Sequence, residues 1–261
     1  MSLTMSFGIA FVTQLAIDPS ARPLPSAHAL RAPITHVATD QPTVAITFDA
    51  CATRTQDNGF DQAIFDLLRA EQVPATIFVS GRWVETHPEA MDLLAAEALI
   101  EFGDHSYDHP HMRRLNAARI GEEIDQTEAA LSLYGKKSVA FRPPFGEWSA
   151  RVLGVLQDRK LPAVLWDVVS GDPSATVTAE EMIHTVLRKT KPGSIVIFHI
   201  NGRARRTAEA LPVILRELRA RGLRFVHLSE LLTAPPPAVA PELGPDDPMP
   251  LSMDGTSLAG D

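Results

Sequence analysis

The stretch VAITFD, residues 44–49, is a short run of β-branched and apolar residues that ends in a carboxylate. Similar apolar runs recur along the chain at 75–79, 99–102, 139–141, 163–166, 194–200 and 224–228. Segments with a helical pattern lie between them, at 61–72, 87–97, 116–134, 149–160, 178–190 and 206–221. Within 116–134, an apolar residue recurs every three or four positions, which is typical of one buried helix face.

The starts of several of these helical segments carry N-cap residues. Asn116, Ser149 and Thr178 each precede a segment, and Glu181 follows Thr178 by three residues as a capping box requires. Strands that alternate with helices predict a parallel sheet of the α/β class. Because closing a sheet removes its edges, the pattern favours a barrel over an open sheet.

The predicted barrel occupies residues 43–233, between an N-terminal extension at 1–42 and a tail at 234–261. Pro, Gly and acidic residues dominate the tail, which predicts a disordered segment or linker. In the extension, the apolar stretch 7–17 and the small residues at 27–29 resemble parts of a signal peptide. A signal peptide normally has Lys or Arg before its apolar stretch, and none precedes this one. The sequence therefore leaves open whether the extension is a signal peptide.

Composition limits the kinds of partner that the chain can bind. It has 24 Lys and Arg against 32 Asp and Glu, a net charge of −8, whereas nucleic-acid binding needs a basic face. We therefore expect no nucleic-acid partner. No run of 18 apolar residues occurs, so we expect no membrane span. Cys51 is the only cysteine, which excludes an intramolecular disulfide.

Ionisable residues follow the apolar runs instead of preceding them. Asp49 ends the first run, His105 follows the third and Arg142 follows the fourth. Asp172 comes after the fifth run, and His199 lies near the end of the sixth. In parallel barrels, catalytic groups gather at the carboxyl ends of the strands. The pattern therefore predicts an active site at that end of the barrel.

Two local stretches suggest a metal site and a base. HSYDH, residues 105–109, spaces two histidines four apart. In a helical turn their Cβ atoms would be about 5–6 Å apart, which suits one tetrahedral metal ion. Two surface histidines are the alternative, but the position after a strand favours the metal. Asp49 can accept a proton from an activated water, although VAITFD alone fits an ordinary turn aspartate equally.

FRPPFG, residues 141–146, predicts a stiff turn because its two prolines and its glycine restrict the backbone. Arg142 at its start can hold a carboxylate, and N–H groups of the turn can face an oxyanion. A rigid connection between strand and helix is the alternative. His199 at the end of an apolar strand can act as a general acid, or it can be a satisfied core residue.

Together these residues resemble the polysaccharide deacetylase family, the NodB-like carbohydrate esterases. The motifs occur in family order over about residues 43–232: TFD at 47–49, HSxxH at 105–109, RxPxG at 142–146, Trp166 with Asp172, and IxH at 197–199. The resemblance implies a distorted (β/α)7 barrel. It also implies a metal-dependent hydrolase that removes N-acetyl, or alternatively O-acetyl, groups from a polysaccharide or oligosaccharide.

The resemblance implies a role for each matching residue. Asp49 would be the general base, and Arg142 would orient Asp49 and pair with Asp172. His199 would be the acid that protonates the leaving amine. The implied substrate-binding residues are Phe145, whose backbone N–H would stabilise the oxyanion, Trp166 and Ile197, which would line the pocket for the acetyl methyl, and Pro144.

The metal site departs from the family pattern. His105 and His109 would bind a divalent ion, zinc or alternatively cobalt or nickel. The family usually supplies a second aspartate as third ligand, but this chain has Ala50, which suggests a variant branch. Water or another side chain would replace that ligand. Asp61 is one candidate, with an N-cap role as its alternative; Cys51 could ligate as a thiolate but is interpreted as a small packed residue.

Two further readings of the function stay open. Some relatives of this barrel open cyclic amides or imides, and a small closed pocket would favour that activity over a glycan. A non-catalytic glycan-binding homologue is the other, although it would need none of the proton chemistry of Asp49 and His199. Pro173 stands where the family often has tryptophan, which predicts an altered groove. A glycan substrate favours a periplasmic or secreted location over a cytoplasmic one.

Overall fold

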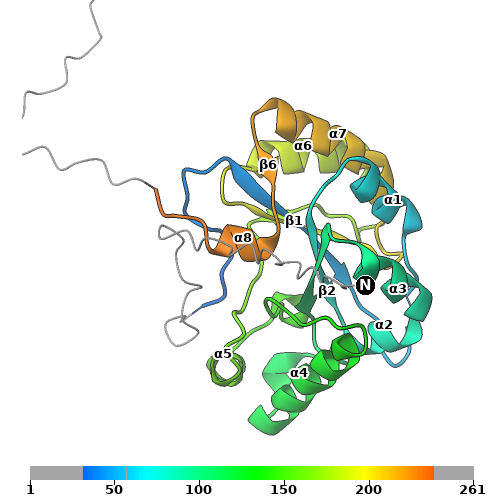
Figure 1. Ribbon diagram of the computed structural model, residues 1–261, viewed down its shortest axis with the longest axis vertical. Coiled ribbons are helices and arrows are strands. Elements are labelled where there is room, and N and C mark those ends of the chain that lie inside the picture. Colours follow the sequence, from blue (N-terminus) through cyan, green and yellow to red (C-terminus); the bar gives the residue numbers. More distant parts are fainter. Residues whose placement is uncertain (1–31, 57, 238–261) are drawn as a thin grey trace, which may run out of the picture.

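The computed structural model describes residues 32–56 and 58–237. In this part of the chain, strands pair only in parallel, in the order β3-β2-β1-β5-β4, with β6 beside the start of β1. The strands are β1 (Thr43–Ala50), β2 (Ala75–Val79), β3 (Ile100–Asp104), β4 (Val168–Val169), β5 (Ile195–His199) and β6 (Arg224–Phe225). β1 lies at the centre of the fold (Figure 1).

Isolated bridges continue the sheet from β3 back to β5. They join Ile34 to Val164, His36 to Ser194, and Phe141 to both Asp104 and Ala163. Because these bridges return to the start of β5, the sheet closes into a distorted barrel, which confirms the predicted fold class. The predicted strands 139–141 and 163–166 contribute only such bridges. Pro143, Pro144 and Pro162 flank them and have no N–H to donate, so a regular ladder cannot extend there.

The described part of the predicted N-terminal extension belongs to the barrel. Ile34 and Val37 pack in the core cluster that includes Val164 and Ile195. The barrel therefore begins before residue 43. The segments 7–17 and 27–29, which resemble a signal peptide, and most of the predicted tail lie outside the described residues.

Helices cover the outside of the barrel, and the predicted caps are present. Asn116, Ser149 and Thr178 each accept a hydrogen bond at a helix start, and Thr178 with Glu181 forms the capping box. α6 and α7 lie together on one flank, opposite α4 (Figure 1). The helices are α1 (Gln62–Ala70), α2 (Gly81–Thr86), α3 (Pro88–Ala96), α4 (Ala117–Ser132), α5 (Ala150–Asp158), α6 (Ala179–Lys189), α7 (Thr207–Ala220) and α8 (Leu228–Leu232), with short 3-10 turns η2 (Met112–Arg114) and η3 (Pro144–Gly146).

The alternation of side chains along β1 separates the helix-facing core from the barrel interior. Ile46 and Phe48 pack in the cluster shared with the helices, where Phe48 stacks on Phe198 with ring centroids 5.7 Å apart. Successive side chains of a strand point to opposite faces, so Thr47 and Asp49 point into the barrel. The strand that builds the outer core thus also delivers a carboxylate to the inside.

Candidate active site

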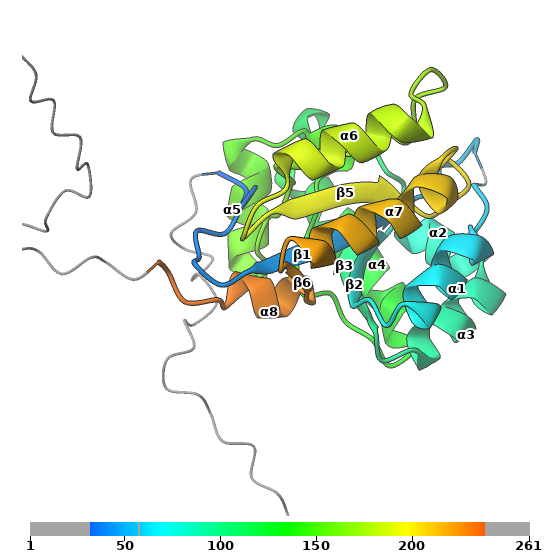
Figure 2. The same cartoon turned by 90° about the horizontal axis from the view of Figure 1, so that it is seen from above.

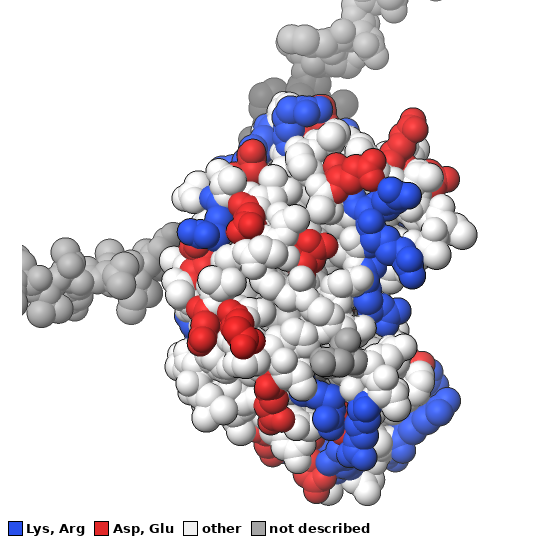
Figure 3. Space-filling view, turned by 90° about the vertical axis from the view of Figure 1, so that its right-hand side faces the viewer, with Lys and Arg blue, Asp and Glu red and all other residues white. Residues whose placement is uncertain are grey.

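The sequence-predicted residues meet at the carboxyl end of the barrel, toward which β5 points in Figure 2. Asp49 and His199 face each other in register on β1 and β5. His105 follows β3 directly, and Arg142 follows the bridge at Phe141. Figure 3 views the side of the molecule at which the strands end, where Lys and Arg side chains gather along one edge.

Asp49 and Arg142 form a buried ion pair. Arg142 Nη1 donates to Asp49 Oδ1 over 2.7 Å, and Nη2 donates to Thr47 Oγ1 over 2.9 Å. The guanidinium lies 3.9 Å from the centroid of the Phe78 ring. Burial favours the neutral acid, but the charge and hydrogen bond of Arg142 help to outweigh it and hold the pKa of Asp49 below its usual value. Asp49 is therefore an ionised carboxylate that can accept a proton.

His105 and His109 lie side by side, with ring centroids 4.8 Å apart. His105 Nδ1 lies 2.7 Å from the carbonyl oxygen of Arg142, which can only accept, so Nδ1 carries the proton and Nε2 the lone pair. Burial lowers the pKa of His105, and it lowers the pKa of His109 to about 3. Both rings are thus neutral, the form in which imidazole binds metal ions.

Cys51 completes this pair into a possible ligand cluster. Its Sγ and one ring nitrogen each of His105 and His109 all lie within 4.8 Å of one another. Cys51 is only 3% exposed, as expected for a packed residue, yet its sulfur faces the histidines. In the protein alone, burial and the charge of Asp49 raise the pKa of the Cys51 thiol to about 12. A thiolate here therefore requires a cation.

Asp61 does not belong to this cluster. It occupies the N-cap position of α1, although its side chain makes no capping hydrogen bond. Its backbone N–H donates to the carbonyl of Ile200 over 2.8 Å. Asp61 follows β1 only after a long loop, whereas Cys51 continues the strand directly. Among the described residues, Cys51 and not Asp61 is the third possible ligand beside the histidines.

The turn that carries the histidines is not helical, so the helical spacing considered for residues 105–109 does not apply. Ser106 and His109 have positive φ angles of 63° and 55°. Glu123 of α4, which is buried, accepts hydrogen bonds from the backbone N–H groups of Tyr107 and Asp108 over 2.9 and 2.8 Å. The sequence analysis missed Glu123. Its signal was a charged residue three positions after Ile120, on the buried face of the helix.

His199 pairs with Asp172 beside the base. His199 Nδ1 lies 2.8 Å from Asp172 Oδ1, and its backbone N–H donates to Oδ2 over 2.6 Å. Thr207 Oγ1 also donates to Oδ2, over 2.9 Å. Burial alone would lower the pKa of His199, but the hydrogen bond and charge of Asp172 outweigh it and raise the pKa. His199 can therefore hold a proton to donate.

This arrangement corrects one expected contact. Arg142 does not pair with Asp172, because both terminal nitrogens of Arg142 are directed to Asp49, Thr47 and the carbonyl of Leu165. Two separate hydrogen-bonded pairs result, Asp49 with Arg142 and Asp172 with His199.

An open cavity of about 620 Å³ is lined by His109 and His111 among other residues. Phe145 is 55% exposed at its edge, with its ring centroid 4.5 Å from that of His109 and 4.4 Å from that of His111. Trp166 lies under Arg142, 5.5 Å from the guanidinium, and Ile197 and Pro144 are buried. Of the predicted substrate-binding residues, Phe145 is the one that lines this cavity.

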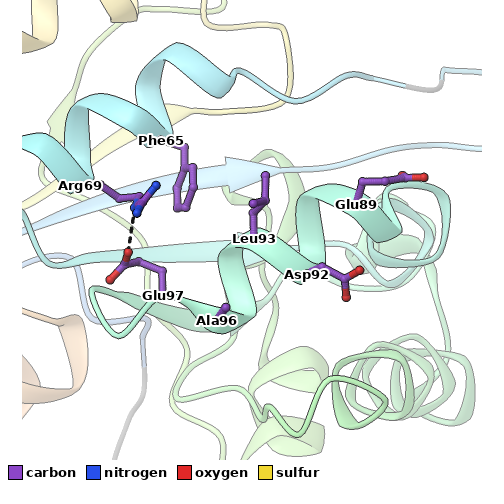
Figure 4. Close-up of a pocket in the computed structure, with 7 residues that line it drawn as sticks. All are labelled: Phe65, Arg69, Glu89, Asp92, Leu93, Ala96 and Glu97. Atoms are coloured by element: carbon purple, nitrogen blue, oxygen red, sulfur yellow. Dashed lines mark hydrogen bonds and ion pairs between the residues drawn. The ribbon is translucent and has the colours of Figure 1, made fainter.

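A second cavity of about 520 Å³ lies between α1 and α3 (Figure 4). Phe65 and Leu93 form its apolar part, and Arg69 pairs with Glu97 at 3.0 Å across it. None of the sequence-predicted site residues lines this cavity. The chemistry described above is therefore confined to the barrel mouth.

Comparison with known proteins gives a consistent family. Residues 36–164 match the family model described as polysaccharide deacetylase. The chain is 31% identical over 192 residues to a peptidoglycan-N-acetylglucosamine deacetylase of Bacillus cereus. The aligned region covers 72% of this chain and 87% of that protein. The chain spans 58%, 67% and 70% of the length of three other curated relatives that it matches.

Solved structures with this fold include an esterase and an inactive relative. A family 4 carbohydrate esterase from Streptomyces lividans, in complex with acetate, has a TM-score of 0.64 and 28% identity, covering 77% of this chain and 100% of that one. A CE4 family pseudoenzyme from Bacillus anthracis has a TM-score of 0.69 and 27% identity, covering 78% of this chain and 69% of that one.

Proposed function

Because the chain belongs to the polysaccharide deacetylase family, we propose that it is a metal-dependent hydrolase that removes N-acetyl, or alternatively O-acetyl, groups from a polysaccharide or oligosaccharide. The observation that carries this proposal is the meeting of a base and an acid around one ligand cluster. Asp49 on Arg142 and His199 on Asp172 flank the cluster that contains His105. A binding protein has no need for such a pair of proton carriers.

Asp49 acts as the general base in this proposal. Arg142 keeps the carboxylate ionised and fixed, so its free oxygen can take a proton from the water that attacks the acetyl carbon. The other oxygen, Oδ1, is occupied by Arg142, which leaves Oδ2 on the side of His105 at 3.5 Å. A fixed carboxylate loses little entropy when it reacts, which is the advantage of positioning.

His199 acts as the general acid. Asp172 binds Nδ1 and raises the pKa of the ring, so Nε2 is the nitrogen that can donate. The proton would go to the leaving nitrogen as the bond between carbon and nitrogen breaks. The backbone N–H of Phe145 is proposed to stabilise the oxyanion, as the family resemblance implies.

The donor set fits a divalent cation. Two neutral imidazoles and a thiol from separate segments come within 4.8 Å of one another. Nitrogen and sulfur ligands suit zinc, with cobalt and nickel as alternatives. A cation bound there would polarise the acetyl carbonyl and lower the pKa of water toward about 7.

The open cavity suits a glycan better than a small cyclic amide. Phe145, which is 55% exposed, offers an aromatic face at this cavity. Trp166, Ile197 and Pro144 are proposed to bind the acetylated sugar. A glycan of this kind favours a periplasmic or secreted location. Within the described residues, no helix combines the length and apolar character needed to cross a membrane.

A non-catalytic glycan-binding protein is the second candidate. The observation in its favour is Ala50, at the position where the resemblance places an aspartate ligand, together with the similar structure described as a pseudoenzyme. The two candidates differ in whether acetate is produced from a bound glycan.

The test is acetate release from chito-oligosaccharides by zinc-loaded protein. We expect release by the wild type and loss of both zinc and activity in His105→Ala. His184→Ala is the matched control, because His184 is exposed on α6 and lies outside the ligand cluster. Full activity in a metal-free His105→Ala protein would refute the mechanism. Glycan binding by the zinc-loaded wild type without acetate release would favour the binding protein.

A further inference from the structure

We propose that the thiolate of Cys51 is the third protein ligand of the divalent cation, in place of the carboxylate that Ala50 lacks. The inference rests on the proposed function for the presence of a metal, but not for the reaction or the substrate. It turns the apparent loss of a ligand into an exchange of one anionic ligand for another.

The direction of the chain after β1 supports this assignment. Cys51 lies two residues beyond Asp49, so the alternation of a strand turns both side chains to the inside of the barrel. Ala50 follows the opposite alternation and packs with Phe48 and Val79 in the outer core. A side chain at residue 50 in this conformation faces the helices, whereas one at residue 51 faces the histidines.

The distances fit a metal site that tightens when the ion binds. Zinc–sulfur bonds of about 2.3 Å and zinc–nitrogen bonds of about 2.0–2.1 Å place tetrahedral ligands roughly 3.3–3.6 Å apart. The ligand atoms of Cys51, His105 and His109 lie within 4.8 Å of one another. Side-chain rotations that move each ligand atom by about 1 Å close that difference. No other group of three such side chains occurs among the described residues.

Charge also favours a thiolate at this position. An imidazole that ligates a metal ion is neutral, and Asp49 Oδ1 is held by Arg142 over 2.7 Å. A dication held only by two neutral rings in a buried site would lack a compensating charge. Cys51 is the group in the cluster that can supply it.

Asn201 gives an independent indication that the sulfur is an acceptor. Asn201 is fully buried in the loop after β5, and its Nδ2 donates to Cys51 Sγ over 3.3 Å and to the Cys51 carbonyl over 2.8 Å. Asn58 Nδ2 donates to the same carbonyl over 2.6 Å. Outer hydrogen bonds of this kind orient a ligand and favour its charged form.

The binding step is an exchange without oxidation or reduction. The S–H bond of Cys51 breaks, a bond between sulfur and the metal forms, and the proton passes to solvent. A bound cation drives this exchange, because a coordinating thiol is deprotonated outright. A soft sulfur ligand favours zinc and cobalt over magnesium and calcium.

The test is the absorption spectrum of the metal-free full chain during titration with cobalt(II). A sulfur-to-cobalt charge-transfer band would belong to Cys51, because the chain has no other cysteine. We expect the band in the wild type and its absence in Cys51→Ser. Cys51→Ser should also weaken zinc binding about 100-fold or more, since even outer partners contribute about 10–100-fold.

Two further variants sharpen the result. Asn201→Ala should weaken zinc binding about tenfold and leave the band in place. Asp61→Asn is the matched control and should change neither the affinity nor the band, because Asp61 lies outside the cluster. Thermal unfolding of the metal-free variants checks that each still folds.

The wild-type spectrum decides the proposal without any variant. One equivalent of cobalt that binds without a charge-transfer band, and that is lost in His105→Ala, overturns cysteine ligation and leaves the deacetylase proposal intact. Failure of the wild type to bind cobalt overturns it as well. A band in a protein that releases no acetate supports the ligand while it contradicts the proposed reaction.

Discussion

The proton-carrying half of the site and its metal-binding half are built in different ways. Asp49 and His199 stand in register on adjacent strands, and each is fixed by an oppositely charged partner. His105, His109 and Cys51 come from a turn and a strand extension, and one ligand atom of each lies within 4.8 Å of the others. The first half has its partners in the protein alone, whereas we propose that an ion completes the second half.

This difference predicts that the two halves fail separately. A change in the strand half, which holds Asp49 and His199, should alter proton transfer and leave metal binding almost unchanged. A change in the turn half, which holds His105, His109 and Cys51, should alter metal affinity first. The three predictions below test that separation, in order of decreasing effect.

Asp49→Asn should have the largest effect. The amide keeps the shape of the carboxylate but cannot take a proton, so kcat should fall about 10²–10⁴-fold. Zinc content should stay near one equivalent, because Asp49 is not in the ligand cluster. Steady-state kinetics with metal analysis of the same preparation measures both. A variant that loses zinc together with activity would show that the two halves are not separate.

Asp172→Asn should have an intermediate effect, of about 100-fold or less on kcat/KM at neutral pH. His199 must be protonated to donate, so activity falls as pH rises through its pKa. Asp172 raises that pKa against the effect of burial. Without its charge, burial lowers the pKa, and the alkaline decline should begin at a lower pH than in the wild type. The pH profile of kcat/KM measures the shift, and an unchanged alkaline limb would contradict the assignment of His199 as acid.

Glu123→Gln should have the smallest effect and should act on the metal half. Its carboxylate holds the backbone N–H groups of Tyr107 and Asp108, which shape the turn between the two histidines. Zinc affinity should fall about tenfold, as for other outer partners of a metal site. Glu122→Gln, an exposed neighbour on α4, is the matched control. Equal losses of zinc affinity in the two variants would contradict the positioning role of Glu123.

Much of the strand half could be predicted from sequence, because it depends on local patterns. A short apolar run followed by an ionisable residue places Asp49 and His199 without knowledge of the rest. Their partners could not all be predicted. Arg142 was matched to Asp172 by family likeness, but the pairing of β4 with β5 brings Asp172 to His199, and Arg142 contacts Asp49 alone of the two carboxylates.

The turn half resisted prediction because its geometry comes from tertiary contacts. The two histidines come together as the metal-site hypothesis requires, but through a turn with positive φ angles that Glu123 holds, and not through a helical turn. Cys51 was interpreted as packing because burial and polarity alone suit a small apolar residue. Extending the alternation of β1 by one step would have turned its sulfur toward the histidines.

The bridge between Ile34 and Val164 has a consequence for how the chain assembles. Its partners are separated by half of the polypeptide, so a growing chain leaves the ribosome with Ile34 long before Val164 exists. Contacts of such long range carry a high entropic cost and form slowly. We expect such pairings, including that of β1 with β5, to form after β1, β2 and β3 have associated.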